Sequence, residues 1–256
     1  MSELVLVEDA DGIRTIRFNR PEKKNALTRA MYSAAATALV TGDADPAIKV
    51  FIIAGAGGIF TAGNDMVDFM QAPPALDGTE IPPVGQFMQA LLKITKPVVA
   101  AVDGLAIGIG VTMLMHCDLV YASPRATFKT PFVDLALAPE YGSSQVMPRI
   151  FGHVIAADLL LLGSSWDADK AARYGLINDV ADDVEALARA TAANLAAKAP
   201  GSLRAAKALM RRAPEPLLDR MGIENNLFGE LLRSEEFTEA ATAFMERRKP
   251  DFSKFG

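Results

Sequence analysis

Cysteine and histidine are the scarcest reactive residues of this 256-residue chain, which has one cysteine, Cys117, and two histidines, His116 and His153. A single cysteine excludes a disulfide within the chain, and three such side chains leave too few ligands for a Cys/His zinc cluster. His116 and Cys117 fall in a mostly apolar segment and His153 follows a glycine, so we expect structural roles for all three. We therefore do not expect these three residues to form a metal site or to take part in catalysis. Carboxylates and backbone groups are the candidates for catalytic groups.

An excess of positive charge and long hydrophobic runs are also missing. The 31 acidic and 26 basic residues give a net charge of −5, which argues against nucleic acid or an anionic membrane as a partner. The longest apolar stretch, residues 105–115, contains two glycines and a threonine and is too short to cross a bilayer core of about 30 Å. The first residues show no basic segment followed by an apolar one, so we expect a cytoplasmic protein without a secretory signal.

Hydrophobic residues, by contrast, make up 50% of the chain, and 22% of the residues are charged, as in a globular protein with a substantial core. A hairpin is expected at the start, followed by buried parallel strands that alternate with glycine turns and helices. The expected strands are Leu4–Val7, Ile13–Phe18, Val50–Ala54, Val98–Val102 and Leu119–Ala122. This order predicts the α/β class.

Beyond Gly142 the pattern changes, because strands become scarce and helical periodicity dominates. Glycines and prolines divide this part into expected helices at 143–150, 154–162, 168–174, 184–198, 202–212, 217–233 and 235–247. We therefore predict two regions, an α/β core over residues 1–195 and a helical region over residues 196–256.

Two glycine-rich turns follow buried strands, at residues 55–65 and 104–110. Phe60 stands where the dinucleotide fingerprint Gly-x-Gly-x-x-Gly needs its third glycine, and the second turn lacks the spacing as well, so a Rossmann site is disfavoured. Either turn alone is explained by a tight passage from strand to helix. Two such turns in successive units allow another interpretation, in which one N–H group from each converges on a single oxygen as an oxyanion hole.

Five segments, in order and spacing, resemble the signature of the crotonase (enoyl-CoA hydratase/isomerase) superfamily. They are residues 19–27 (NRPEKKNAL), 60–65 (FTAGND), 103–110 (DGLAIGIG), 117–122 (CDLVYA) and 244–252 (FMERRKPDF). The resemblance covers essentially the whole chain. It implies a crotonase-like spiral of ββα units, a helical C-terminal trimerisation region and binding of an acyl-CoA thioester. It also implies a homotrimer or a dimer of trimers.

The resemblance further implies where the reacting thioester is held. The oxyanion-hole donors would be the backbone N–H groups of Asn64, which follows Gly63, and of Ile109, which lies between Gly108 and Gly110. Because both donors belong to the main chain, a side-chain change at Asn64 should matter less than a change that moves the turn. Loss of such a donor typically lowers the rate by about 10²–10³-fold.

Coenzyme A, as part of the substrate rather than a resident cofactor, would be held by positions at both ends of the chain. Lys24 and Ala26 match the loop that holds the nucleotide and pantetheine, and Ala62 and Asp65 belong to the motif beside it. The other expectation is that Asp65 caps its helix and that Lys24 lies in a solvated loop. C-terminal positions that reach CoA, sometimes in a neighbouring subunit, are matched by Phe244 and Arg247; ordinary helix packing is the alternative for Phe244. The basic residues expected to gather at the CoA mouth are Arg20, Lys23, Lys24, Arg247, Arg248 and Lys249.

The catalytic acids decide which crotonase reaction is expected. Hydratases use two glutamates, and this chain has Thr112 and Phe132 at the matching positions, neither of which can act as a general base. Glu140, within residues 137–144 (LAPEYGSS), matches the single catalytic glutamate of the peroxisomal-type Δ3,Δ2-enoyl-CoA isomerases. Asp134 is a second carboxylate that would be either an auxiliary or, as we favour, a surface residue.

A single carboxylate suits an isomerase. Glu140 would remove the C2 proton of a 3-enoyl-CoA and return it to C4, while the oxyanion hole holds the thioester oxygen of the dienolate. We expect burial among Phe132, Leu135 and Leu137 to raise the pKa of Glu140. The simpler explanation of Glu140 is an acid stabilised by the start of the helix at 143.

Two further functions stay open at this point. One is hydration of a 2-enoyl-CoA or another crotonase reaction, and the other is binding of acyl-CoA without catalysis. A proline-containing loop at about residues 70–84 is expected to border an apolar acyl tunnel, with plain core packing as the alternative. The neighbouring residues that suggest the tunnel are Met66, Phe69, Met70, Phe87 and Met88.

Overall fold

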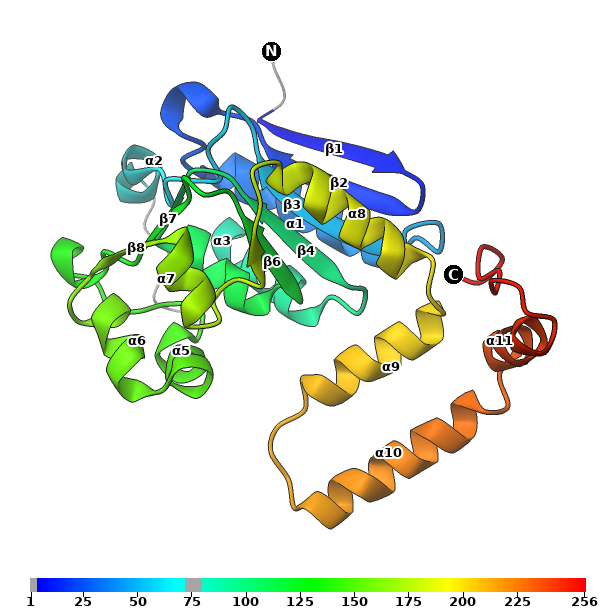
Figure 1. Cartoon of the computed structure of the whole chain (residues 1–256). Helices are drawn as coiled ribbons and strands as arrows, with labels where there is room; N and C mark the ends of the chain where they lie inside the picture. Colours follow the sequence, from blue (N-terminus) through cyan, green and yellow to red (C-terminus); the bar gives the residue numbers. More distant parts are fainter. Residues whose placement is uncertain (1–3, 72–79) are drawn as a thin grey trace.

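A six-stranded sheet forms the centre of the protein, which we describe from a computed structural model that defines residues 4–71 and 80–256 (Figure 1). The strand order is β1-β2-β3-β4-β6-β9. The strands are β1 Val5–Ala10, β2 Ile13–Phe18, β3 Val50–Gly55, β4 Val98–Val102, β6 Leu119–Ala122 and β9 Asp179–Val180. All five predicted strands are therefore present, which confirms the α/β class.

The first two strands pair antiparallel, and all later neighbours in the sheet pair parallel. The β1–β2 hairpin turns at Asp11 and Gly12, both with positive φ, as a two-residue hairpin turn requires. In the parallel part, Ile16, Ile53 and Ala100 stand in one row. Because the strands run the same way, the turns that follow β3 and β4 leave from the same edge of the sheet, where ligands bind in open α/β sheets.

A second, three-stranded sheet contains β5 Leu105–Ile107, β7 Thr127–Lys129 and β8 Ser165–Asp167. The sequence predicted only a glycine turn at residues 104–110, whereas the middle of this segment is β5, paired parallel with β7. The region beyond Gly142 holds the short strands β8 and β9. Strands of two or three residues are too short for a visible alternation, and their pairing partners lie far away in the sequence.

The helices of the described residues include all seven that the sequence predicts beyond Gly142. They are α1 Arg29–Ala44, α2 Met66–Gln71, α3 Pro83–Lys93, α4 Ile109–Thr112, α5 Ser143–Phe151, α6 His153–Leu160, α7 Ala168–Arg173, α8 Val184–Ala196, α9 Pro200–Met210, α10 Leu217–Leu231 and α11 Glu235–Met245. Residues 4–71 and 80–256 also contain single turns of 3-10 helix, which are η1 Pro21–Lys23, η2 Met113–His116 and η3 Val133–Leu135. From α5 onward every predicted boundary lies within two residues of the observed one. Three of these helices begin with a side-chain cap, from Asp167, Asp183 and Ser234. Such capping residues explain why the sequence predicts where these helices start.

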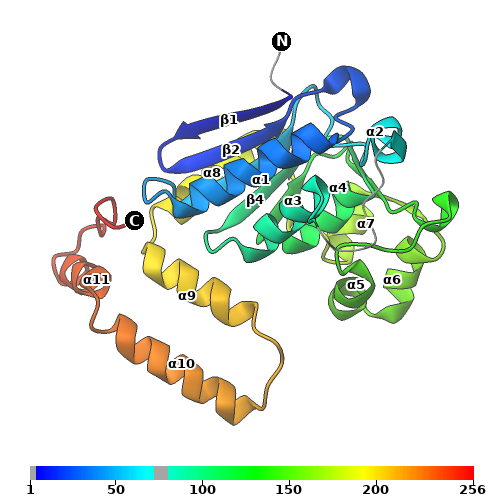
Figure 2. The same ribbon diagram turned by 180° about the vertical axis from the view of Figure 1, so that it is seen from behind.

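Helices cover both faces of the six-stranded sheet. Figure 2 shows α1 and α3 side by side on one face, and α8 covers the other face (Figure 1). Successive residues of β3 divide between the two cores: Phe51 and Ile53 face the α1 side, whereas Ile52 packs in the α8 cluster. Helix α8 contributes an i, i+4, i+8 row to that cluster, which consists of Val184, Ala188 and Ala192. The core is thus a three-layer α/β/α arrangement.

The C-terminal helices lie outside these layers. Helix α9 packs against the body through the buried Lys207, whereas α10 has no buried residue. Figures 1 and 2 show α10 and α11 standing apart from the sheet, with the end of the chain returning toward the β1–β2 hairpin. There, Lys49 Nζ donates to the carbonyl oxygen of Phe252 at 2.7 Å. The predicted helical C-terminal region is confirmed, while trimerisation and the division at residues 195/196 stay predictions.

No helix in the part of the chain that the structure describes is long and apolar enough to cross a membrane.

Candidate functional site

The two glycine turns lie side by side and are joined by hydrogen bonds. Thr61 N–H donates to the carbonyl oxygen of Leu105 at 2.8 Å, and Ile107 N–H donates to that of Thr61 at 3.1 Å. These bonds form a parallel bridge between Thr61 and Ala106. The pairing explains why β5 extends into the predicted turn, and it places the segments that carry Asn64 and Ile109 next to each other.

Glycine is required where the turns approach most closely. Gly63 has φ +87°, and a Cβ at this position would lie 2.8 Å from the carbonyl oxygen of Ile107. A Cβ on Gly110 would lie 2.7 Å from the methyl group of Thr61. Both contacts are shorter than real Cβ atoms tolerate, so these glycines permit a spacing that no other residue allows.

The N–H groups of Asn64 and Ile109 donate to no backbone acceptor among the described residues. Leu27 bonds to both sides of Asn64, because its N–H donates to Gly63 O at 2.8 Å and its carbonyl accepts from Asp65 N–H at 2.9 Å. The N–H of Asn64 therefore faces away from Leu27, as alternation in a parallel bridge requires. Ile109 is the first residue of α4, so its N–H has no acceptor within that helix. In the described part of the chain, both groups therefore lack a partner within the bridge or helix to which they belong.

Glu140 lies between η3 and α5, and its carboxylate is held by α4. Thr112 donates its hydroxyl hydrogen to Glu140 Oε1 at 2.5 Å. The other oxygen, Oε2, is buried and has no hydrogen-bond partner among the described residues. The explanation of Glu140 as a helix-start acid is disfavoured, because no side chain caps α5 and the carboxylate binds Thr112 instead. One carboxylate oxygen is therefore bonded to Thr112, and the other has no partner in the part of the chain that the structure describes.

The surroundings of Glu140 favour its protonated form. Burial raises the pKa of Glu140, and the hydrogen bond from Thr112 opposes this only in part. Burial also raises the pKa of the Tyr32 phenol, with a further contribution from the negative charge of Glu140. Tyr141 is affected in the same way by burial first, then by Cys117 and Glu140. Two phenols from different elements therefore lie within electrostatic reach of the carboxylate.

The sequence placed the burial of Glu140 in the wrong surroundings. Phe132 is buried, as expected, but Leu135 and Leu137 are 48% and 44% exposed. The reason is that η3 is a single surface turn without a buried residue and ends at Ala136 in the left-handed conformation. Leu135 and Leu137 are therefore close to Glu140 in the sequence but do not bury its carboxylate.

Tyr32 is a site residue that the sequence interpretation missed. Its hydroxyl donates to Asn64 Oδ1 at 2.5 Å, and the residue is only 4% exposed. Its ring packs against that of Phe87, with centroids 5.7 Å apart. The sequence contains one indication of this role. Tyr32 is a phenol beside the apolar helix face that includes Met31, and a buried hydroxyl needs a hydrogen-bond partner.

Four of the predicted CoA-binding residues lie together at one end of the site. The loop with Lys24 and Ala26 runs beside the first glycine turn, where Ala62 N–H donates to Lys24 O at 2.9 Å. Lys24 is exposed. Asp65 accepts from Arg20 Nη1 at 2.6 Å and from the N–H groups of Val67 and Asp68 in the first turn of α2 at 3.0 Å. The ion pair with Arg20 is the main cause that lowers the pKa of Asp65. The carboxylate of Asp65 therefore serves as the expected helix cap, and its role toward CoA stays a prediction.

Phe244 and Arg247 lie elsewhere in the same chain. Phe244 is 85% exposed, and the segment after it packs near Lys49, beside the start of β2. Lys24 lies beyond the opposite end of β2, a strand of six residues that is about 20 Å long. Arg248 is paired with Glu239 at 2.6 Å. One chain alone therefore does not bring the two predicted basic groups into a single CoA mouth.

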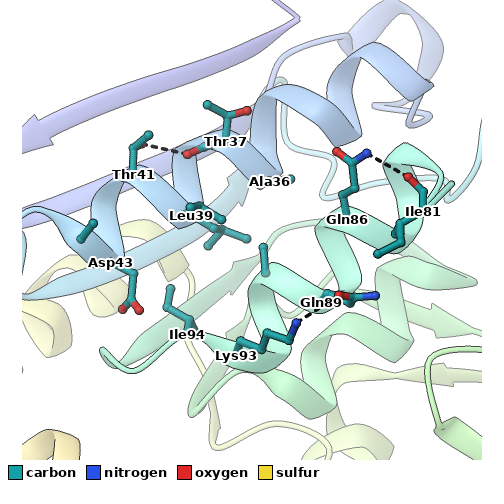
Figure 3. A pocket seen from close by; sticks show the side chains of 13 residues that line it. Ala36, Thr37, Leu39, Thr41, Asp43, Ile81, Gln86, Gln89, Lys93 and Ile94 are labelled. Atoms are coloured by element: carbon teal, nitrogen blue, oxygen red, sulfur yellow. Dashed lines mark hydrogen bonds between the residues drawn. The ribbon is translucent and has the colours of Figure 1, made fainter.

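The cavities divide in a similar way. A small cavity of about 30 Å³ borders Asn64 and is also lined by Tyr32 and Phe69. A larger groove of about 640 Å³ lies between α1 and α3 (Figure 3), but its lining contains none of Glu140, Asn64 and Ile109. Of the expected tunnel residues, Phe87 is part of the core while Met66 and Met70 are exposed. The middle of the expected loop, residues 72–79, lies outside the described residues.

The remaining candidates have structural contacts. Asp134 pairs with Lys129 at 3.0 Å on the surface, as we favoured. Burial raises the pKa of the Cys117 thiol to about 12, so it is not a nucleophile at neutral pH. His153 is exposed at the start of α6, and His116 contacts Tyr141. Within residues 4–71 and 80–256, no group of three or more His, Cys, Asp or Glu side chains is arranged to hold a metal ion.

Known proteins match the chain over almost its full length. The model of the enoyl-CoA hydratase/isomerase family matches residues 8–254. The chain is 34% identical over 255 residues to "Crotonyl-CoA hydratase" of Syntrophomonas wolfei, covering 98% of each protein. It is 35% identical over 258 residues to human "Enoyl-CoA delta isomerase 2", covering 96% of this chain but 64% of that protein. A solved structure from Magnetospirillum magneticum AMB-1, described as an enoyl-CoA hydratase/carnithine racemase, superposes with a TM-score of 0.95 at 48% identity and covers 99% of this chain and 100% of that one. Hydratases and isomerases both occur among the similar proteins.

Proposed function

The chain belongs to the enoyl-CoA hydratase/isomerase family, and from this premise we propose that it converts a 3-enoyl-CoA into the trans-2-enoyl-CoA. One observation carries the proposal. Thr112, at the position of a hydratase glutamate, has a hydroxyl instead and uses it to hold Oε1 of Glu140 at 2.5 Å. This leaves Oε2 buried and without a partner. A single oriented carboxylate is what a proton shuttle needs.

The proposed reaction moves one proton and changes no other atom of the substrate. Oε2 of Glu140 takes a proton from C2, the C3=C4 electrons delocalise into a dienolate, and the negative charge develops on the thioester oxygen. The same carboxylic acid then gives the proton to C4, which leaves the double bond between C2 and C3. Glu140 ends the cycle as a carboxylate, ready for the next substrate.

The oxyanion in this proposal is bound by the backbone N–H groups of Asn64 and Ile109. Both lack an acceptor in the described part of the chain, and the turns that carry them are bonded together through Thr61. Preorganised donors of this kind contribute about 3–4 kcal/mol each to the stability of the transition state. Burial raises the pKa of Glu140, which makes the carboxylate a stronger base toward the C2 proton.

Hydration is the alternative, because the relative from Syntrophomonas wolfei bears the name of a hydratase. Addition of water needs a group that activates the water besides the one that delivers a proton to carbon. Phe132, at the second hydratase position, is apolar and 6% exposed. The hydroxyl of Thr112 is already bonded to Glu140. These contacts favour isomerisation over hydration.

The proposal includes binding of the CoA part by two chains. Lys24 and Ala26 would contact it from one subunit, and Phe244 and Arg247 from a neighbour in a homotrimer or a dimer of trimers. The exposed apolar side chains of the C-terminal helices support this, because such patches mark contact surfaces. They include Leu217, Leu218, Phe228, Phe244 and Met245, all more than 65% exposed.

The test compares two reactions in one preparation. The wild-type protein should isomerise 3-hexenoyl-CoA and should hydrate crotonyl-CoA slowly or not at all. E140Q should lose isomerisation by several orders of magnitude while it still binds a saturated acyl-CoA in calorimetry. D134N, which changes a carboxylate on the surface, is the matched control and should keep the wild-type rate. An active E140Q, or robust hydration by the wild type, would overturn the proposal.

A further inference from the structure

The residue after Glu140 has an unusual backbone. Tyr141 has φ +56°, a left-handed conformation that is unfavourable for a bulky side chain. Gly142, the next residue, also has positive φ. Strain of this kind persists only where surrounding contacts fix it. The contacts of Tyr141 therefore determine the position of the peptide that carries Glu140.

Two elements hold Tyr141 from different sides. Its hydroxyl donates to the carbonyl oxygen of Met88 in α3 at 2.8 Å. Its own carbonyl oxygen lies 3.0 Å from Nε2 of His116 in η2. A carbonyl can only accept, so Nε2 of His116 must be the protonated nitrogen. The two rings also pack, with centroids 4.0 Å apart. Tyr141 is thus fixed at both its ring and its backbone.

Arg211 of the C-terminal region connects the same two elements. Its guanidinium donates to the carbonyl oxygen of His116 at 2.8 Å, and to those of Leu92 and Ile94 at 3.1 and 3.2 Å. Carbonyls at helix ends favour such a cation. Arg211 therefore ties the end of η2 to the end of α3, the two elements that Tyr141 bridges on the side of Glu140.

The peptide of Glu140 is held on its other side by α5. The carbonyl oxygen of Glu140 accepts from Ser143 N–H at 3.0 Å and from Ser143 Oγ at 2.7 Å. With Tyr141 fixed after it, the backbone of Glu140 has little freedom. The carboxylate accepts from Thr112, and among the described residues it has no second hydrogen bond that would set its direction.

We propose that His116 and Tyr141 are positioning residues, which hold the strained turn so that the Glu140 carboxylate stays buried against Thr112. This inference rests on the proposed function of Glu140. It gives His116 a role in the reaction although its ring touches neither the carboxylate nor, in this proposal, the substrate. A relaxed turn would move the carboxylate outward, away from the α-carbon that it must reach.

The ionisable groups around this turn come from several elements. Burial, and to a smaller extent the charge of Glu140, raises the pKa of Tyr32 of α1. Glu140, Cys117 and Arg211 all affect the pKa of Tyr141. Burial lowers the pKa of His116, the hydrogen bond to Tyr141 opposes this in part, and Arg211 lowers the pKa further. The net shift is downward, so the ring is neutral at neutral pH and keeps one donor and one acceptor nitrogen.

The experiment uses H116F, which keeps an aromatic ring on Tyr141 but removes the Nε2–H donor. We expect the kcat for 3-hexenoyl-CoA to fall about ten-fold or more, since small displacements of a reacting group have large effects, with little change in KM. The acid limb of the pH profile of kcat should move to lower pH, because a more solvated Glu140 loses part of its raised pKa. H116Q, whose amide can donate to Tyr141 O, should recover most of both. H153Q, at an exposed histidine, is the matched control.

A second measurement does not depend on activity. The carboxyl carbon of Glu140, observed by ¹³C NMR over a pH titration, should report a lower pKa in H116F than in the wild type, and a recovered one in H116Q. A kcat loss without a shift of either the pH limb or this titration would mean a merely structural role and overturn the inference. E140Q is assayed in parallel: if it is inactive while H116F behaves as wild type, the positioning role fails and the proposed function stands. If E140Q is active, the proposed function fails and the inference with it.

Discussion

Ile109 and Thr112 stand at the two ends of α4, a helix of one turn. The N–H of Ile109 has no acceptor within this helix, and Thr112 binds the Glu140 carboxylate through its hydroxyl. Three residues along a helix correspond to a rise of about 4.5 Å. The proposed oxyanion donor and the anchor of the proposed acid thus belong to one rigid element, so their separation does not depend on a loop.

Replacing Thr112 by valine tests the anchor. T112V has nearly the same shape but no hydroxyl, so Glu140 loses the one hydrogen bond that opposes the effect of burial. The pKa of Glu140 should rise further, and the acid limb of kcat/KM should move to higher pH, opposite to the shift expected for H116F. The rate at neutral pH should fall about ten-fold, as for the loss of a hydrogen bond to a charged group. T112S should retain the wild-type limb, and a T112V limb that does not move would contradict the anchoring role.

A methyl group at Gly63 tests the geometry of the oxyanion turn. In G63A the new Cβ would lie 2.8 Å from Ile107 O at a φ of +87°, so the turn must shift and the N–H of Asn64 with it. We expect kcat to fall about 10²-fold, the usual effect of losing one oxyanion donor. G175A is the matched control, because Gly175 has φ +79° but open space around its Cβ position. It should lose stability without losing kcat, whereas equal losses in both variants would argue against the oxyanion role.

Tyr32 and Asn64 should act as a pair. Y32F removes only the hydroxyl that donates to Asn64 Oδ1 and preserves the packing with Phe87. The kcat should fall about five-fold, corresponding to one neutral hydrogen bond. If Tyr32 acts by orienting the Asn64 side chain, the same change made in an N64A background should have no further effect. Additive losses in the double variant would show that the two residues act separately.

The fold could be predicted where the sequence carries local signals. Capping side chains such as Asp183 and Ser234 mark helix starts, and Pro200 opens α9 as the first helical residue. Continuous runs of apolar residues, as in the buried strand Val50–Gly55, indicate central strands. The three-residue strand β5 carries neither signal, because it exists through its bonds to Thr61 and to β7.

The candidate site was predictable only in part, for a related reason. Motif positions pointed to Glu140, Asn64 and Ile109 as the groups of interest. The partners of Asn64 and Glu140 lie 32 and 28 positions away in the chain, in the bond from Tyr32 to Asn64 and that from Thr112 to Glu140. No spacing in the sequence reports such a contact. Tertiary packing decides which hydroxyl reaches which side chain.

The buried ion pair between Asp118 and Lys207 should stabilise the attachment of α9. Asp118 Oδ2 accepts from Lys207 Nζ at 2.6 Å and from Val98 N–H at 2.7 Å, and the Lys207 side chain is 5% exposed. D118N would leave this ammonium buried without its counter-charge, so the free energy of unfolding should fall by about 3 kcal/mol. D9N, which breaks the more exposed pair with Arg14, should cost less than about 1 kcal/mol. Urea unfolding measures both, and equal losses would contradict the buried character of the first pair.

Glu140 should lower the stability of the protein at the pH at which it works. Burial raises the pKa of Glu140 in the folded state, so the folded protein binds this proton more tightly than the unfolded chain does. The stability that comes from this difference is complete below the unfolded pKa of about 4.3 and is lost as the pH rises through the folded pKa. E140Q keeps an oxygen that can accept from Thr112 but cannot ionise. It should therefore unfold at a higher temperature than the wild type near pH 7, and this difference should shrink toward pH 4. D134N, which breaks only the surface pair with Lys129, should show no such gain. A margin independent of pH would mean that burial of the carboxylate does not oppose folding.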